Sequence, residues 1–147
     1  TTAARPDRDR PARPTEIPVN YTDSQLAALN ANPLYHAIGI RVTRVVDGAA
    51  ESVLDPQPAV CWPTPGRPHG GVLFTVLDTT MAFAAISNGA EGSGCATVDC
   101  NVQYTATADH GPYTCLVNTT SKTSRTVFVR GVLAPWGHPL LLQRPLL

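Results

Sequence analysis

Asp78 is the only acidic residue in the stretch HGGVLFTVLDTTMAFAAIS, which runs from position 69 to position 87. Its neighbours are nearly all apolar, and a carboxylate among apolar side chains is costly unless another group compensates it. Three interpretations compete: a structural carboxylate that pairs with an arginine or faces a solvated groove, a metal ligand, and a catalytic carboxylate tuned by its neighbours. The metal interpretation is weak, because no histidine or carboxylate lies three or four residues away along this stretch.

The same stretch begins with His69, Gly70 and Gly71. A helix that starts here leaves backbone N–H groups unpaired where the helix dipole favours negative charge. Glycine lets a ligand approach that backbone closely, so an oxyanion of acyl-transfer chemistry can be held there. Gly70 and Asp78 lie about 12 Å apart along a helix axis. One helix therefore does not easily bring both to a single carbonyl, whereas a second copy, antiparallel across a dimer axis, would place its Asp78 opposite Gly70.

The elements around these residues indicate an α+β domain. The quoted stretch lacks internal glycine or proline after Gly71, and SNGAEGSG follows it, so we predict a helix of about 16 residues, buried on most sides. Two strands precede it, and three or four long strands joined by short turns follow it. The sequence thus predicts a curved antiparallel sheet of five to six strands wrapped around one long central helix.

Particular segments support this arrangement. TDSQLAALNANP predicts a short helix that Thr22 or Asp23 caps and Pro33 stops. GIRVTRVVDG predicts a strand that ends in an Asp-Gly turn, with AAESVLDP as its hairpin partner. CATVDCNVQY predicts a strand with one mainly apolar face, and LLLQ at 140–143 predicts the last strand. The apolar face of CATVDCNVQY comprises Ala96, Val98, Cys100, Val102 and Tyr104.

Composition limits the possible partners and surroundings. The 147 residues carry 11 basic and 11 acidic side chains, so nothing favours nucleic acid, and no apolar run is long enough to span a membrane. Residues 1–18 are rich in Arg and Pro and are expected to form a disordered tail, with a single domain over 19–147. The N-terminal residues have no apolar segment typical of a secretory signal. The four cysteines form no zinc-binding pattern. We expect buried thiols in a reducing compartment and a cytoplasmic location, against the alternative of two disulfides in an exported protein.

These motifs resemble those of hot-dog-fold acyl-CoA thioesterases, most closely the phenylacetate-degradation-type subgroup. PGRPHGGVLFTVLDTTMAFAA resembles the H-G-G-x(6)-D signature, ATVDCNVQYTATADHG resembles the following strand and loop, and SKTSRTVFVRGVL resembles a later K-x-G-[RK]-T strand. Two positions depart from the family pattern. Pro63 stands where many relatives carry an Asn, although Gly66 is retained, and Ser124 stands where Gly is usual.

The resemblance implies a homodimer or a dimer of dimers, with active sites at the subunit interface. Asp78 would be the general base or the nucleophile, and the Gly70 N–H would polarise the thioester oxygen. Thr97 would help to orient Asp78 or water. His69 would be architectural or would position the substrate.

Further residues are candidates for substrate binding. Lys122 and Arg125 are candidates for the phosphates of coenzyme A or a carrier-protein surface, against the alternative of ordinary solvated strand ends. Trp62 and Phe74 are candidates for an acyl pocket, although core packing is the commoner role of such aromatics, and Gly71 extends the glycine start of the helix. Arg130 is a further candidate for the coenzyme A phosphates or for the carrier-protein surface, with the same alternative. Structural or surface roles are assigned to Asp99, His36, His110 and His138.

The predicted function is hydrolysis of an acyl thioester of coenzyme A or of an acyl carrier protein, without a metal or redox cofactor. One rival is a hot-dog hydratase, dehydratase or lyase that acts on a thioester. Such enzymes usually pair an Asp with a His about five residues away, and no histidine follows Asp78 within this helix. The other rival is a non-catalytic acyl-thioester binding module, which the proline at position 63 keeps open.

Overall fold

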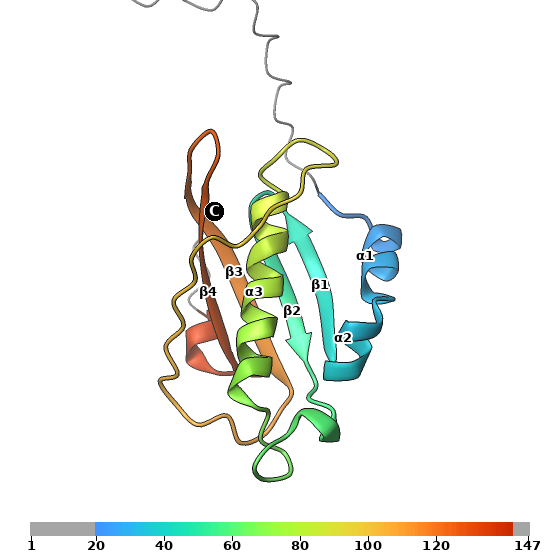
Figure 1. Cartoon of the computed structure of the whole chain (residues 1–147), viewed down its shortest axis with the longest axis vertical. Coiled ribbons are helices and arrows are strands. Elements are labelled where there is room, and N and C mark those ends of the chain that lie inside the picture. The colour runs from blue at the N-terminus through green and yellow to red at the C-terminus, as the bar shows by residue number, and fades with distance from the viewer. Residues whose placement is uncertain (1–19, 143–147) are drawn as a thin grey trace, which may run out of the picture.

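The computed structural model describes residues 20–142. In this part of the chain one long helix, α3 (Gly70–Ile86), lies across a four-stranded antiparallel sheet of order β1-β2-β3-β4. Figure 1 shows α3 in front of the sheet and two short helices beside β1. The predicted α+β class is confirmed. The predicted tail over residues 1–18 lies outside the described residues.

Two short helices lead into the sheet. Helix α1 (Asp23–Asn30) is capped by Thr22, whose hydroxyl accepts from the Gln25 N–H while the Gln25 side chain accepts from the Thr22 N–H. Helix α2 (Pro33–Ile38) starts at a proline, which is well suited to a first helical turn. Thr22 is therefore the predicted cap, and Pro33 both follows one helix and begins the next.

Strands β1 (Ile40–Val46) and β2 (Ala49–Leu54) form the predicted hairpin, joined by a turn at Asp47 and Gly48, which both have positive φ. A bulge between Val42 and Arg44 inserts one extra residue, so Val45 rather than Val46 is buried at the end of β1.

Strands β3 (Tyr113–Lys122) and β4 (Val127–Pro135) form the second hairpin. The predicted strand over CATVDCNVQY does not join this sheet. No backbone–backbone hydrogen bond involves residues 95–104 of the described chain, and Val98, on the expected core face, is 92% exposed. LLLQ is also not a strand, because Pro139–Leu142 form a short 3₁₀ helix, η2. The sheet therefore has four strands, not five to six.

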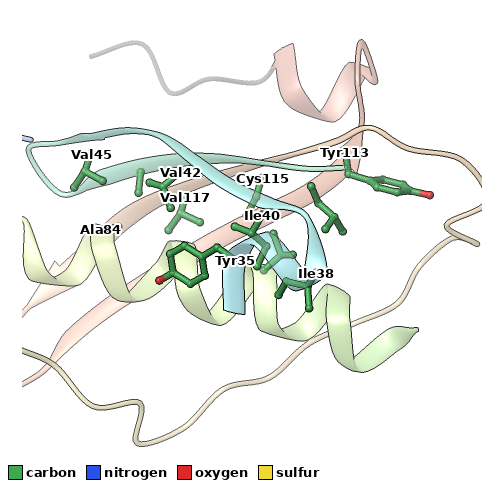
Figure 2. Close-up of a cluster of buried hydrophobic side chains, with 12 residues drawn as sticks. Tyr35, Ile38, Ile40, Val42, Val45, Ala84, Tyr113, Cys115 and Val117 are labelled. Atoms are coloured by element: carbon green, nitrogen blue, oxygen red, sulfur yellow. The ribbon is translucent and has the colours of Figure 1, made fainter. Parts of the chain in front are cut away.

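The core lies between α3 and the inner face of the sheet, as Figure 2 shows. Val76, Thr80 and Ala84 form the fully buried stripe of α3, one turn apart from each other. The rest of α3 is half-buried or exposed, so the expectation that it is buried on most sides is wrong for the single chain. The other members of the core are Tyr35, Ile38, Ile40, Val42, Val45, Ala50, Leu54, Tyr113, Cys115 and Val117.

The four cysteines are free thiols, but the expected burial is found only for Cys115: Cys61 and Cys100 are half-buried and Cys95 is exposed. Within residues 20–142, no three His, Cys, Asp or Glu side chains gather closely enough to hold a metal ion. No helix in the described region has the length and apolar character required to cross a bilayer.

Candidate active site

The start of α3 presents one free backbone donor. The His69 side chain caps the helix, because its Nδ1 accepts from the Gly71 N–H at 2.9 Å. The His69 carbonyl accepts from Val72 and Leu73. In the described chain, the Gly70 N–H has no acceptor. His69 thus caps the helix, and this arrangement leaves the Gly70 N–H as the donor available to a ligand.

A short loop fixes this helix start in place. The Trp62 N–H donates to the Arg67 carbonyl at 2.8 Å, and the His69 N–H donates to the Val60 carbonyl at 2.9 Å. Gly66 adopts φ +83° in this loop, a conformation that favours glycine. Pro63 lies in the same loop, and its side chain has no hydrogen-bond donor.

The Asp78 carboxylate lies halfway along α3 and receives a hydrogen bond from another segment. The Thr97 hydroxyl donates to Asp78 Oδ1 at 2.7 Å. Asp78 is half-buried and Thr97 is exposed, so the pair is accessible from solvent. Among the described residues no cation forms an ion pair with Asp78. The interpretation of Asp78 as one half of a buried Arg pair therefore receives no support in this single chain, and the predicted contact between Thr97 and Asp78 is present.

Residues 95–104, which we call the strap, connect both parts of the site. The strap runs antiparallel to α3 and contacts it through side chains: Cys95 Sγ to the Ala82 carbonyl at 3.6 Å, Thr97 to Asp78, and Tyr104 Oη to the Gly70 carbonyl at 2.8 Å. In Figure 1 the strap follows α3 and descends beside β4 without strand pairing. One segment therefore holds both the candidate carboxylate and the candidate oxyanion donor.

The strap also brings two thiols near Asp78. Burial raises the pKa of the Cys95 thiol, and the negative charge of Asp78 raises it further. Burial likewise raises the pKa of the Cys100 thiol, with further contributions from Asp78 and Asp99. Both groups are therefore protonated thiols at neutral pH and poor nucleophiles.

The aromatic candidates lie at the helix start and on its exposed side. The Trp62 ring is 6.2 Å from the His69 ring, and its side chain is 68% exposed. Phe74, in the second turn of α3, is 37% exposed. Neither residue lines the larger cavity of the described chain. Trp62 lies in the loop before α3, next to the helix cap His69, and Phe74 lies about one turn after Gly70.

Lys122 and Arg125, candidates for binding phosphates, lie at the opposite end of α3. Lys122 Nζ donates to the carbonyl of Asn88, just beyond the C-terminus of α3. Arg125 lies in the β3–β4 turn, where its backbone N–H donates to Thr123. The separation of Asn88 from Gly70 is about 27 Å along the helix direction. A single chain therefore does not bring these cations to its own Gly70.

One contact was not anticipated from the sequence. Tyr104 was assigned to the apolar face of a strand, but its hydroxyl bonds the first carbonyl of α3. Seven extended residues from Thr97 to Tyr104 can span about 23 Å, whereas Asp78 and Gly70 lie about 12 Å apart along α3, so the spacing alone does not indicate this contact.

Comparisons with known proteins agree with this geometry. A family model described as thioesterase superfamily matches residues 66–133, which contain the glycine start, Asp78, Thr97 and the strap. No curated protein matches the chain.

Several solved structures share the fold. A conserved protein from Pseudomonas aeruginosa superposes with a TM-score of 0.66 at 23% identity, over 72% of this chain and 84% of that chain. A phenylacetic acid degradation-related protein from Ralstonia eutropha gives 0.64 at 23% identity, over 73% and 83% of the two chains. A thioesterase from Haemophilus influenzae gives 0.65 at 17% identity, over 79% and 90%. The resemblance of this chain to the hot-dog thioesterase superfamily, predicted from its motifs, is therefore confirmed.

Proposed function

We propose that this protein hydrolyses an acyl thioester of coenzyme A or of an acyl carrier protein, and that Asp78 is the essential catalytic carboxylate. The observation that carries the proposal is the strap, which holds Asp78 through Thr97 and holds Gly70, with its free N–H, through Tyr104. A carboxylate and an oxyanion donor are the two groups that thioester hydrolysis requires.

In the proposed reaction the thioester oxygen accepts a hydrogen bond from the Gly70 N–H. Asp78 removes a proton from water as the water oxygen attacks the carbonyl carbon. The C–O bond forms and the negative charge moves to the carbonyl oxygen, where the start of α3 stabilises it. The C–S bond then breaks, the thiolate takes a proton, and a carboxylic acid and a thiol are released.

Direct attack by Asp78 on the carbonyl carbon is the alternative route. It forms an acyl–aspartyl anhydride and releases the thiol, after which water cleaves the anhydride. A single turnover in ¹⁸O-water distinguishes the routes, because only attack by Asp78, followed by addition of water to the aspartyl carbonyl, leaves ¹⁸O in the enzyme.

We further propose that the active unit is a homodimer. Gly70 and Asp78 of one helix are about 12 Å apart along its axis, too far for one carbonyl group to contact both. An antiparallel α3 of a second copy would place its Asp78 opposite the first Gly70, forming two equivalent sites across a two-fold axis.

The test measures thiol release from a panel of acyl-coenzyme A and acyl carrier protein thioesters, with wild type beside Asp78→Asn. We expect wild type to release thiol and the variant to lose about a hundredfold or more of kcat. Retained activity in Asp78→Asn would refute its catalytic role. Binding without thiol release from any member of the panel would favour the binding module that Pro63 keeps open, while loss of substrate without thiol release would indicate a lyase or hydratase.

A further inference from the structure

A cavity of about 580 Å³ lies between α3, β4 and residues 101–108. Its volume is in the range typical of small-molecule sites. Five aliphatic or thioether side chains from the helix and the sheet form one wall: Leu73, Leu77, Met81, Val129 and Leu133. The rest of the lining is more polar and includes the end of the strap together with Arg130 and His138.

The apolar wall follows from two regular spacings. Leu73, Leu77 and Met81 are four residues apart and form one stripe of α3. Val129 and Leu133 lie on the face of β4 that is directed toward the helix, with Gly131 between them. A Cβ at Gly131 would lie 2.9 Å from the Val117 side chain and 3.4 Å from that of Leu77, so the glycine lets α3 pack closely against the sheet beside the cavity.

The cavity adjoins the candidate oxyanion donor. Tyr104 lines the cavity, and its hydroxyl bonds the Gly70 carbonyl. Leu73 also lines the cavity and lies less than one turn after Gly70. A carbonyl group at the Gly70 N–H is therefore close to the mouth of an apolar space in the same subunit.

We propose that this cavity binds the acyl group of the thioester whose carbonyl is held by Gly70 of the same subunit. The proposal rests on the proposed thioester chemistry and adds the class of acyl group. The stripe from Leu73 to Met81 is about 12 Å long, so the cavity accepts an uncharged, apolar acyl chain of medium length. Met81, at the end far from Gly70, limits that length. Trp62 and Phe74 lie outside this cavity and contact other parts of the substrate.

The test fills or enlarges the far end of the cavity. Met81→Trp is compared with Met81→Ala and with Phe128→Trp, which adds similar bulk to an exposed residue of β4 outside the cavity. The substrates are butyryl-, octanoyl-, dodecanoyl- and palmitoyl-coenzyme A. Calorimetric binding of the matching non-hydrolysable thioethers gives a readout that does not require turnover.

We expect Met81→Trp to lower kcat/KM for octanoyl and dodecanoyl groups, relative to butyryl, by about tenfold or more. Met81→Ala should shift the preference toward the longer chains, and Phe128→Trp should leave the profile unchanged. The thioether affinities should follow the same order. Circular dichroism checks that each variant is folded, and Met81→Ala provides the test if Met81→Trp is not.

Two other results would overturn the assignment. An acyl-length profile that is the same in Met81→Trp, Met81→Ala and wild type would place the acyl group elsewhere. Loss of dimerisation in Met81→Trp with an unchanged profile would assign the cavity to a second copy of the chain. Chain-length-dependent thioether binding by a protein that hydrolyses no thioester would retain the cavity assignment and refute only the hydrolase proposal.

Discussion

At the scale of single residues, two N–H groups at the N-terminus of α3 differ: one is bonded within the helix cap, and the other is available to a ligand. His69 Nδ1 accepts the Gly71 N–H, whereas the Gly70 N–H has no acceptor in residues 20–142. Gly70 is the first residue of the helix, and the preceding His69 has ψ 140°, a conformation that also suits a residue before proline. A single substitution at Gly70 can therefore remove this N–H donor.

Gly70→Pro should remove the N–H without disrupting α3, because proline is well tolerated at the first helical position. Loss of one oxyanion donor should lower kcat by about a hundredfold to a thousandfold. The matched control is Gly70→Ala, which keeps the N–H and places a Cβ in ordinary contact with the Tyr104 ring at 3.7 Å. Steady-state kinetics of both variants checks the prediction, and equal losses of kcat would show that the N–H is not the oxyanion donor.

Thr97→Val should lower kcat by about tenfold, because it removes the hydroxyl that donates to the Asp78 carboxylate, and bonds to charged groups are among the stronger ones. Thr97→Ser retains the donor and should retain most of the activity. Unfolding curves would show little change in either variant, since Thr97 is exposed. Similar kcat values for Thr97→Val and wild type would limit Thr97 to a structural contact.

At the scale of elements, α3 is joined to the sheet by a buried polar contact inside the core. Ser52 and Thr80 hydroxyls are 2.6 Å apart, and Thr80 donates to the Val76 carbonyl. The neighbouring Cys115 thiol is fully buried, and burial raises its pKa to about 12, although hydrogen bonds with Thr80 and Ser52 oppose the shift. The helix that bears the site is thus held to β2 and β3 by hydroxyl and thiol groups that must remain uncharged.

This pKa shift predicts a loss of stability at high pH. The unfolded thiol ionises near pH 9, whereas the folded thiol stays protonated until about pH 12. Ionisation of the unfolded state should therefore lower the free energy of unfolding by about 1.4 kcal/mol between pH 8 and pH 10. Denaturant unfolding at both pH values should show that the free energy of unfolding falls by about 1.4 kcal/mol more in wild type than in Cys115→Ala. Equal losses in the two proteins would show that Cys115 does not contribute.

At the scale of the whole molecule, the separation of Gly70 and Asp78 along α3 determines how many copies of the chain form one proposed site. The strap contacts α3 at three points between Ala82 and Gly70, and its backbone forms no backbone–backbone hydrogen bond in the described chain. A strand-like segment without a partner commonly pairs with another chain. The proposed dimer would use this exposed segment, and its sites would be complete only with both copies.

Mixing Asp78→Asn with Gly70→Pro tests whether the two groups act across the interface. Each variant alone should be nearly inactive. After subunit exchange, half of the molecules would be mixed dimers with one intact site, so activity should recover to about a quarter of wild type. The absence of recovery, with mixed dimers verified by differential tagging, would place Gly70 and Asp78 of one site in the same chain.

Local patterns were sufficient for several elements. The Thr22 cap, the Asp47-Gly48 turn and the long helix after Gly70 depend on neighbouring residues, and all are present. The HGG start and Asp78 were also recognisable, because a glycine pair before an apolar helix and a carboxylate within it are local features. The bulge that turns Val45 inward was not predictable, because it depends on pairing between two strands.

The sequence by itself determined the fold class, the helix and the residue types that are capable of acyl chemistry, because periodicity, caps and turns act over a few neighbouring residues. Only the tertiary structure decided that residues 95–104 lie along α3 rather than within the sheet. It also decided that His69 removes one of the two glycine donors, that Tyr104 holds Gly70, and that an apolar cavity opens beside it. These features depend on contacts between segments far apart in the chain, whose relative placement no local pattern specifies.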